Sequence, residues 1–262
     1  MGEKLLSIGI PSLEVRNKQL NRLLVELEKQ IIENGFEDLV EIIVAVDNKE
    51  ISKGEKFNMM MENATGKYVV GIGDDDIVAP TYIKEIMDVV KTEKYDHITF
   101  NMLYKDKTTT YPMTFSKKHT YLSFYFPFNI KIRIYKYYDV TNPEKKELYF
   151  KERLLIKNNF LIILFILIFK KFMRKQSCPT WPTMVIKKEI ANKVKYTNID
   201  REEDIEWAIN IGKLNLIKEE YNINKDLYFY TKNFYYFDRE KNIEIEHKIQ
   251  PIDKNIIKFV KK

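Results

Sequence analysis

The sequence has only one cysteine, Cys178, among its 262 residues, so no disulfide can form within the chain. A single thiol is typical of proteins from a reducing compartment. Glycine and proline are also scarce, with eight residues each, and they do not gather into a low-complexity linker. We therefore expect one large domain or two small ones.

Several common catalytic patterns are absent as well. The three histidines, His97, His119 and His247, do not have the spacing of a zinc site. The chain contains no G-x-x-x-x-G-K-[ST] phosphate loop and no G-x-G-x-x-G turn that opens a helix. Ser7 and Ser12 lack the context of a nucleophile elbow. Zinc hydrolases, P-loop nucleotide hydrolases and serine hydrolases thus find little support.

No apolar run is long enough to cross a membrane, so we expect no transmembrane span. The stretch NNFLIILFILIF, residues 158–169, would span about 18 Å as a helix, against a bilayer core of about 30 Å. Three interpretations stay open for it: a buried core helix, a helix in a membrane interface, or a partner-binding surface. Its basic flanks suit the interface, so peripheral membrane contact through residues 158–173 is an alternative to burial.

The N-terminus and the net charge bear on location and partners. The first residues lack the apolar run of a signal peptide, which predicts a cytoplasmic protein, at most peripheral to the inner face of a membrane, and host cytoplasm if it is viral. The net charge is +6 and the pI is about 9.0. This charge suits nucleotides, nucleic acid or an anionic membrane, and a solvated lysine-rich surface explains it equally well.

Apolar periodicity predicts alternating strands and helices in the first part of the chain. Strands are expected at 5–10, 40–46, 68–72 and 97–104, and helices at 17–34, 55–64 and 80–94. This alternation predicts an α/β fold with a mostly parallel sheet and helices on both faces. Ligands of such sheets bind beyond the carboxyl ends of the strands.

The later part of the chain has a weaker pattern. Residues 130–134 alternate as a strand whose basic face carries Lys131 and Arg133. The other expected elements are helices at 184–194 and 205–211, an aromatic strand at 227–237, and a charged, peripheral C-terminal tail at 241–262.

Polar residues follow three of the predicted strands, at 11–16, at Asp47 and Asn48, and at the triplet Asp74, Asp75 and Asp76. These segments should converge on one crevice. Adjacent carboxylates need a cation, and Mg²⁺ or Mn²⁺ takes one or two protein carboxylates together with water and phosphate oxygens. The alternative is an acidic turn that caps the next helix. The position after the third strand favours the metal.

A second acidic cluster, Glu202, Glu203 and Asp204, begins a predicted helix in the segment REEDIEWA. Carboxylates there stabilise the helix dipole, or one of them acts as a general base toward a hydroxyl. Trp207 lies three residues after Asp204, on the same helical face, where it would contact an acceptor or exclude water. Lys56 would neutralise phosphate charge or be an ordinary surface lysine.

Four blocks of this sequence resemble family-2 glycosyltransferases with the GT-A fold, particularly the small viral, phage and bacterial members. The blocks are SIGIPSLEVR, EIIVAVDNKEISKGEKFNMMMENATGKYVVGIGDDDIV, CPTWPTMVIKKEIA and REEDIEWA. The resemblance implies a single domain over residues 1–240. Residues 1–104 would form its nucleotide-sugar-binding half, and residues 105–240 would form its acceptor half.

The resemblance also implies a role for individual residues. The nucleotide sugar would be held by Pro11, Ser12, Leu13, Glu14, Arg16, Asp47, Asn48, Lys56, Asn58, Asp74 and Asp75. Asp76, with Asp74, would bind Mn²⁺ or Mg²⁺. Asp204 would be the catalytic base, with Glu203 beside it. Trp181 and Trp207 would line the acceptor side.

The implied reaction is an inverting, metal-dependent transfer of a sugar from a nucleotide diphosphate sugar, with a UDP-sugar as the expected donor. The expected acceptor is a hydroxyl of a glycan or glycoconjugate. A hydroxylated base of viral DNA is the alternative, which the high pI and the basic strand favour. A non-catalytic nucleotide-binding module and a nucleotidyltransferase stay open too, because a fold alone does not establish an activity.

Overall fold

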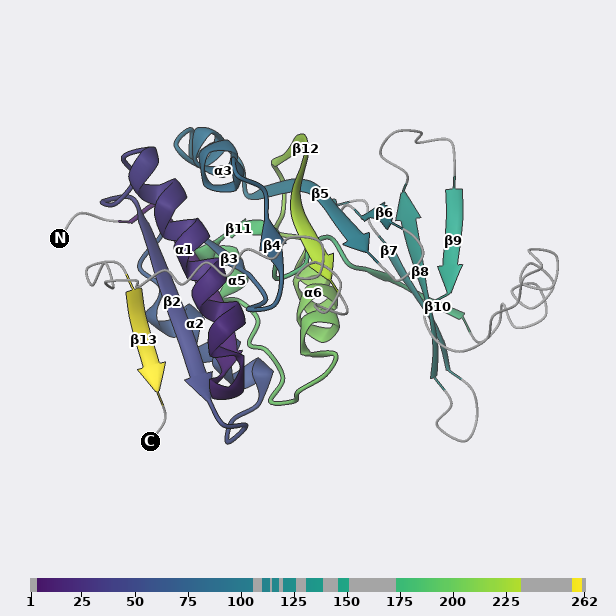
Figure 1. Ribbon diagram of the computed structural model, residues 1–262. Coiled ribbons are helices and arrows are strands. Elements are labelled where there is room, and N and C mark those ends of the chain that lie inside the picture. The colour runs from purple at the N-terminus through teal and green to yellow at the C-terminus, as the bar shows by residue number, and fades with distance from the viewer. Residues whose placement is uncertain are drawn as a thin grey trace.

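Two β-sheets organise the protein, for which the computed structural model describes residues 4–105, 110–113, 115–117, 120–125, 131–138, 146–150, 173–231 and 256–260. In the described residues the larger sheet has nine strands, in the order β13-β2-β1-β3-β11-β5-β12-β4 with β6 beside β5 (Figure 1). Its strands are β1 (Leu6–Leu13), β2 (Val40–Asp47), β3 (Tyr68–Gly71), β4 (Ile77–Val78), β5 (His97–Lys105), β6 (Thr110–Met113), β11 (Val185–Lys187), β12 (Glu220–Thr231) and β13 (Ile256–Val260).

The larger sheet is mostly parallel, as the sequence predicts. β13, β2, β1 and β3 are paired in parallel, and so are β5 and β12. β11 lies antiparallel between β3 and β5, while β4 and β6 are antiparallel to β12 and β5. The parallel strands therefore all point the same way, and their carboxyl ends share one edge of the sheet.

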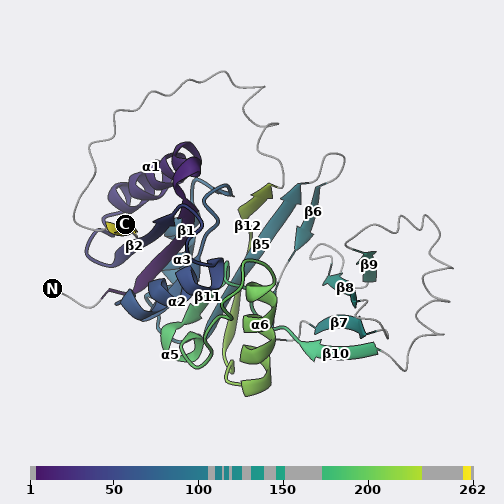
Figure 2. The same cartoon turned by 90° about the horizontal axis from the view of Figure 1, so that it is seen from below.

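A smaller antiparallel sheet, in the order β10-β7-β8-β9, lies beside the larger one (Figures 1 and 2). Its strands are β7 (Thr120–Tyr125), β8 (Lys131–Tyr138), β9 (Lys146–Phe150) and β10 (Met173–Ser177). β8 confirms the strand predicted at 130–134. The apolar segment at 158–169 lies outside the described residues. Within the described ranges, no helix has the length and apolarity that crossing a membrane requires.

Helices cover both faces of the larger sheet (Figure 2). They are the short 3-10 helix η1 (Glu14–Arg16), α1 (Asn17–Glu33), α2 (Lys53–Asn63), α3 (Tyr82–Val90), α5 (Lys188–Ala191) and α6 (Glu203–Leu214). Side chains of β2 alternate between two cores, as the period of a strand requires. Ile42 and Val44 pack with α1 and α3, whereas Ile43 and Ala45 pack with α2 and α6.

The end of α1 shows how local sequence sets an element boundary. Gly35 has φ +67, a conformation that a residue with a Cβ rarely adopts. Its N–H bonds to the oxygen of Ile32, and the N–H of Phe36 bonds to the oxygen of Ile31, each at 3.0 Å. This pair of bonds is a Schellman motif, so the predicted helix end at Gly35 is confirmed.

Two segments differ from the sequence predictions. A helix is predicted over 184–194, but β11 forms first and only Lys188–Ala191 is helical. Val185 and Ile186 pair with β5 and β3, so long-range pairing outweighs the helical pattern. The predicted peripheral tail also contributes to the sheet, because Ile256–Val260 pairs with β2 as an edge strand.

Candidate functional site at the carboxyl edge of the sheet

The carboxyl ends of β1, β2 and β3 lie side by side, since these strands are adjacent and parallel. Side chains link the segments that follow them. Ser12 Oγ donates a hydrogen bond of 2.7 Å to Asp74 Oδ2. Lys56 Nζ donates one of 2.6 Å to the main-chain oxygen of Ser12, and it forms an ion pair with Asp47. The three polar segments therefore meet at one edge of the sheet.

The Asp47–Lys56 pair is buried, with 0% of Asp47 and 4% of Lys56 exposed. Burial alone would raise the pKa of Asp47, but Lys56 and the N–H groups of Ile51 and Lys49 outweigh it, and the pKa is lowered. The sequence predicts that Lys56 contacts the donor. In the structure its ammonium connects α2 to the ends of β1 and β2, through Ser12 and Asp47.

Asp74 and Arg16 form the second pair. Asp74 is 2% exposed, and its Oδ1 accepts a hydrogen bond of 2.8 Å from Arg16, opposite the bond from Ser12. Burial would lower the pKa of Arg16, but Asp74, Asp75 and Asp76 raise it. The same guanidinium lies 3.4 Å from Asp75, whose side chain is 42% exposed. Arg16, also 42% exposed, is thus a cation at the surface of this edge.

Asp76 is held from several sides. It is 3% exposed, its carboxylate accepts a hydrogen bond from the hydroxyl of Tyr228, and its main-chain oxygen accepts one of 2.8 Å from Arg22. Its N–H donates to the oxygen of Gly73 at 3.0 Å. A Cβ on Gly73 would lie 2.6 Å from Asp76 Oδ2, so only glycine leaves room for this carboxylate.

Glu14 and Asn48 connect the segments that follow β1 and β2. Asn48 Nδ2 donates a hydrogen bond of 2.7 Å to Glu14 Oε2. Pro11 and Leu13 belong to β1 itself, and Leu13 pairs with Asp47 at its end. These four residues, all predicted to hold the nucleotide, thus surround the same edge of the sheet.

Asn58 lies away from the strand ends. Its Nδ2 donates to the oxygen of Tyr196 at 2.9 Å, and its Oδ1 accepts from the N–H of Tyr196 at 2.8 Å. The sequence predicts a donor contact for Asn58. In the structure, both Nδ2 and Oδ1 of its side chain form hydrogen bonds with the main chain of the segment before α6.

The second acidic cluster begins α6, and Glu202 before it has φ 73. Glu203 is 1% exposed, and its Oε1 lies 3.0 Å from Lys53 Nζ, at the start of α2. Burial raises the pKa of Glu203, and Lys53 offsets part of this rise. Asp204 is only half-buried, so of the two carboxylates it is the more accessible to solvent.

Lys53 links this cluster to the aspartate triplet. Burial would lower the pKa of Lys53, but Glu203, Asp204 and Asp76 raise it. The ammonium of Lys53 therefore lies in the field of both acidic segments. At Gly54, α2 packs closely against the segment before α6 and against its first residue, because a Cβ there would lie 1.9 Å from the oxygen of Thr197 and 3.4 Å from Cβ of Glu203. The two acidic segments, far apart in the sequence, thus face one region.

The two tryptophans have different environments. Trp207 is 1% exposed and stacks on Tyr196 with ring centroids 4.9 Å apart, and Tyr196 stacks on Phe57 at 4.8 Å. The predicted acceptor contact of Trp207 is replaced by packing in the core between α2 and α6. Trp181 is half-buried and stacks on Phe115 at 5.2 Å, so part of its ring stays at the surface.

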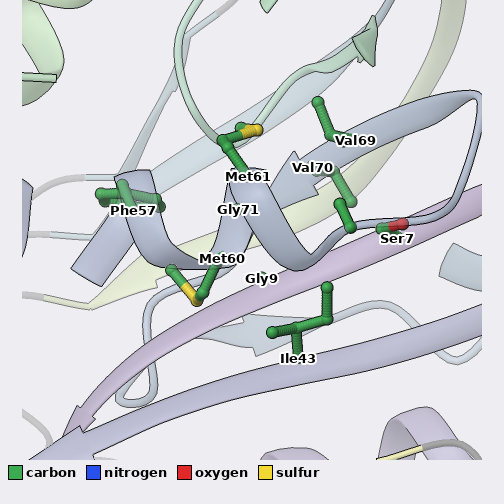
Figure 3. A pocket seen from close by; sticks show the side chains of 10 residues that line it. Ser7, Gly9, Ile43, Phe57, Met60, Met61, Val69, Val70 and Gly71 are labelled. Carbon is green, nitrogen blue, oxygen red and sulfur yellow. The ribbon is translucent and has the colours of Figure 1, made fainter. Parts of the chain in front are cut away.

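A small cavity under α2 is separate from this edge (Figure 3). It lies between α2 and the strands β1, β2 and β3, and Figure 3 shows the side chains of Phe57, Met60 and Met61 of α2 around it. Its volume is about 10 Å³, room for a water molecule at most. We regard it as a packing gap rather than a ligand site.

The comparisons with known proteins agree with this architecture. The family model described as glycosyl transferase family 2 matches residues 24–177, more than half of the chain. The chain belongs to glycosyl transferase family 2. The match includes Asp47 and the aspartate triplet and ends before α6. No curated protein sequence matches the chain.

Solved structures of S. aureus TarS are similar in fold to this family-2 chain. Residues 1–349 of TarS in complex with UDP-GlcNAc have a TM-score of 0.54 and 15% identity, covering 87% of this chain and 59% of that one. A longer TarS chain has a TM-score of 0.53 and 14% identity, and the shares covered are 87% and 36%. The predicted GT-A fold is confirmed, and this chain spans about three fifths of the TarS 1–349 chain.

The triplet of this family-2 chain fits a hard divalent cation. In the described residues, no three His, Cys, Asp or Glu side chains form a ready metal cage. Mg²⁺ and Mn²⁺ need only one or two carboxylates when phosphate oxygens and water complete the shell. Both oxygens of Asp74 already accept bonds from Ser12 and Arg16. Asp74 is also ion-paired with Arg16, whose positive charge opposes a cation there, so Asp76 is the better-fitting ligand of the two.

Sequence reasoning missed three residues of the candidate site: Lys53, Arg22 and Tyr228. Each contacts a residue to which a motif gave a role, yet none of the three was itself given one. Lys53 lies three residues before Lys56, so the basic character of SKGEKFN was the one available signal. Arg22 and Tyr228 reach Asp76 from α1 and β12, which only the folded chain brings together.

Replacing Lys53 with methionine should destabilise the fold by about 1–2 kcal/mol near neutral pH. The value lies below the cost of breaking a fully buried pair because Lys53 is 44% exposed. Without its cation, Glu203 would have a still higher pKa, above that of the unfolded chain. Between the pKa of Glu203 in the unfolded chain and its pKa in the folded variant, the free energy of unfolding falls as pH rises. The stability that the variant loses relative to the unchanged protein should therefore shrink toward about pH 5.

Urea unfolding of this variant and the unchanged protein at about pH 7.5 and about pH 5 measures the effect. Lys195→Met is the matched control, because its partner Glu62 and Lys195 itself are 61% and 79% exposed. The control should lose under about 0.5 kcal/mol at both values. Equal losses in the two variants would show that the Lys53 pair has no special part in the fold.

Proposed function

We propose that this chain transfers a sugar from a nucleotide diphosphate sugar to an acceptor hydroxyl. The observation that carries the proposal is the position of Lys53. Its ammonium lies 3.0 Å from Glu203, and the nearby charges of Glu203, Asp204 and Asp76 raise its pKa against the effect of burial. A nucleotide edge and a carboxylate able to act as a base therefore border the same region, which a single displacement at the anomeric carbon requires.

The donor would be a UDP-sugar. TarS, which shares the fold, is described in complex with UDP-GlcNAc and with UDP. The nucleotide would lie along the ends of β1 and β2, near Glu14, Arg16 and Asn48. The diphosphate would lie beside the triplet, where Arg16 offers an exposed guanidinium.

Asp76, with Asp74 beside it, would hold Mn²⁺ or Mg²⁺. When bound, the ion would supply Lewis-acid stabilisation of the leaving diphosphate. Ser12 and Arg16 would fix the orientation of the Asp74 carboxylate. Tyr228 and Arg22 would do the same for Asp76.

Asp204 would act as the general base. It would take the proton of the acceptor hydroxyl as the hydroxyl oxygen bonds to the anomeric carbon and the bond to the diphosphate oxygen breaks. One displacement inverts the anomeric centre and needs no covalent intermediate, unlike the two-step reaction of retaining glycosidases. Glu203, paired with Lys53, would support the start of α6 rather than move a proton.

The acceptor would be a glycan or glycoconjugate hydroxyl bound near Trp181. The stack of Trp181 on Phe115 gives a half-buried aromatic face, a surface suited to a sugar ring. A hydroxylated DNA base is the second candidate, which the net charge of +6 favours. Retention on DNA that weakens steeply as salt rises would favour the DNA base.

A thermal-shift screen of nucleotide diphosphate sugars with Mn²⁺ tests the proposal. A ligand at about 100 times its Kd adds about 2.7 kcal/mol of stability, and about 1 kcal/mol moves the midpoint of a domain of this size by about 2–4 °C. At least one UDP-sugar should therefore raise the midpoint by several degrees, less so with EDTA. No shift from any sugar nucleotide would contradict the proposal, and a shift from nucleoside triphosphates alone would favour a nucleotidyltransferase.

A further inference from the structure

The hydroxyl of Tyr228 makes two contacts at the aspartate triplet. It donates a hydrogen bond to Asp76 Oδ2, and it accepts one of 3.1 Å from the N–H of Gly73. Tyr228 itself is 0% exposed. One buried oxygen thus fixes both the carboxylate of Asp76 and the main chain at the start of the turn that carries it.

The main chain of Tyr228 is fixed as well. Tyr228 lies in β12 and pairs with Val78 of β4, which begins directly after Asp76. The N–H of Ala79 also bonds to the oxygen of Leu227 at 2.9 Å. The segment after the triplet and the strand that carries the tyrosine are therefore one hydrogen-bonded unit. The hydroxyl reaches Asp76 from a backbone that cannot shift independently of it.

Tyr82 provides a comparison within the same protein. It is also 0% exposed and belongs to the same core as Tyr228. Among the described residues, its hydroxyl has no hydrogen-bond partner. An unpaired buried hydroxyl is unfavourable, so the burial of Tyr82 must be stabilised by the packing of its ring and not by its hydroxyl. The two tyrosines differ in what the hydroxyl contacts, and only that of Tyr228 is directed at the candidate metal ligand.

We propose that Tyr228 is a positioning residue, which orients the Asp76 carboxylate for a divalent cation bound together with the nucleotide diphosphate. This inference rests on the proposed function. Tyr228 is an outer partner and Asp76 the ligand, because a protonated phenol donates to a carboxylate and is a poor ligand for a hard cation. Loss of an outer partner of a metal ligand typically lowers metal affinity by about 10–100-fold.

The test compares Tyr228→Phe with Tyr82→Phe, since each change removes one buried hydroxyl from the same core. The measurement is the UDP dissociation constant from calorimetry, and for each protein the constant in EDTA is divided by the constant with Mn²⁺. Tyr228→Phe should lower this ratio about 10-fold or more. Tyr82→Phe should leave it unchanged. Because each protein is its own reference, a change in overall stability does not alter the ratio.

The outcomes separate the inference from the function on which it rests. If the unchanged protein binds no UDP with Mn²⁺, the proposed function fails. If it binds and Tyr228→Phe keeps the same ratio as Tyr82→Phe, the inference is overturned while the function stands. Should Tyr228→Phe not fold, Gly73→Ala takes its place, because the added Cβ displaces the same carboxylate. That variant should lower the ratio too, and an unchanged ratio would overturn the inference.

Discussion

Replacing Asp204 with asparagine should slow sugar transfer by about 10²–10⁴-fold, the range that a general base contributes. Asparagine has nearly the same shape, and it cannot take a proton from the acceptor hydroxyl. Because Asp204 lies at the start of α6 and not at the strand ends, affinity for UDP with Mn²⁺ should stay within about twofold. The measurement is the turnover number for the best donor of the screen, with UDP binding followed by calorimetry.

Glu206→Gln is the matched control for Asp204→Asn. It removes the same charge two residues further along α6, on another face of the helix. The new amide oxygen can still accept the bond that Thr197 donates to Glu206. A large fall in the turnover number of both variants would mean that the negative charge at the start of α6 matters, rather than a single base. An Asp204→Asn variant with an unchanged turnover number would remove Asp204 from the mechanism.

Replacing Asp76 with asparagine should have the second large effect. A bound metal ion supplies several kcal/mol of charge stabilisation, and about 1.4 kcal/mol is a factor of ten in rate. We therefore expect transfer to fall at least about 100-fold, together with loss of the tightening of UDP binding by Mn²⁺. UDP binding in EDTA should change little, because the nucleotide contacts of β1 and β2 are intact.

Asp75→Asn provides the control for position within the triplet. Asp75 is adjacent in sequence, but its side chain is 42% exposed, and Arg16 lies 3.4 Å from it. Its replacement should affect Mn²⁺-dependent UDP binding by less than about tenfold. If Asp75→Asn abolished the metal effect while Asp76→Asn kept it, the assignment of the ligand within the triplet would be reversed.

The parallel half of the fold could be predicted from the sequence because its signals are local. The run VEIIVAVD marks β2, and its side chains are all buried. Leu20, Leu23 and Leu27 give α1 its apolar face, and Gly35 ends it. β11 could not be predicted in this way. Its three residues are a strand only because β3 and β5 leave a space between them.

The residues of the candidate site also differ in whether local sequence could identify them. Motifs contiguous in sequence identified Asp47, the aspartate triplet and Asp204. The partners that hold them come from distant elements, as with Tyr228 of β12 and Lys53 of α2. Sequence reasoning also gave direct ligand roles to Lys56, Asn58 and Trp207. Their contacts are internal, because a pattern shows which residue types occur and not which way their side chains point.

The charged side chains of the candidate site are arranged in oppositely charged pairs. Asp47 has Lys56, Asp74 has Arg16, and Glu203 has Lys53. Buried charges are tolerated when they are paired and hydrogen-bonded. The pairs also fix the loops at the ends of β1, β2 and β3 before any ligand arrives, which lowers the cost of ordering them on binding.

Hydrogen–deuterium exchange with and without UDP and Mn²⁺ tests the central claim most directly, that the ends of β1, β2 and β3 form one nucleotide site. The account predicts slower exchange at residues 11–16, 47–56 and 72–78 together, and little change under α2 at the cavity near Met60. UDP binding that slowed exchange elsewhere, or in only one of the three segments, would contradict it.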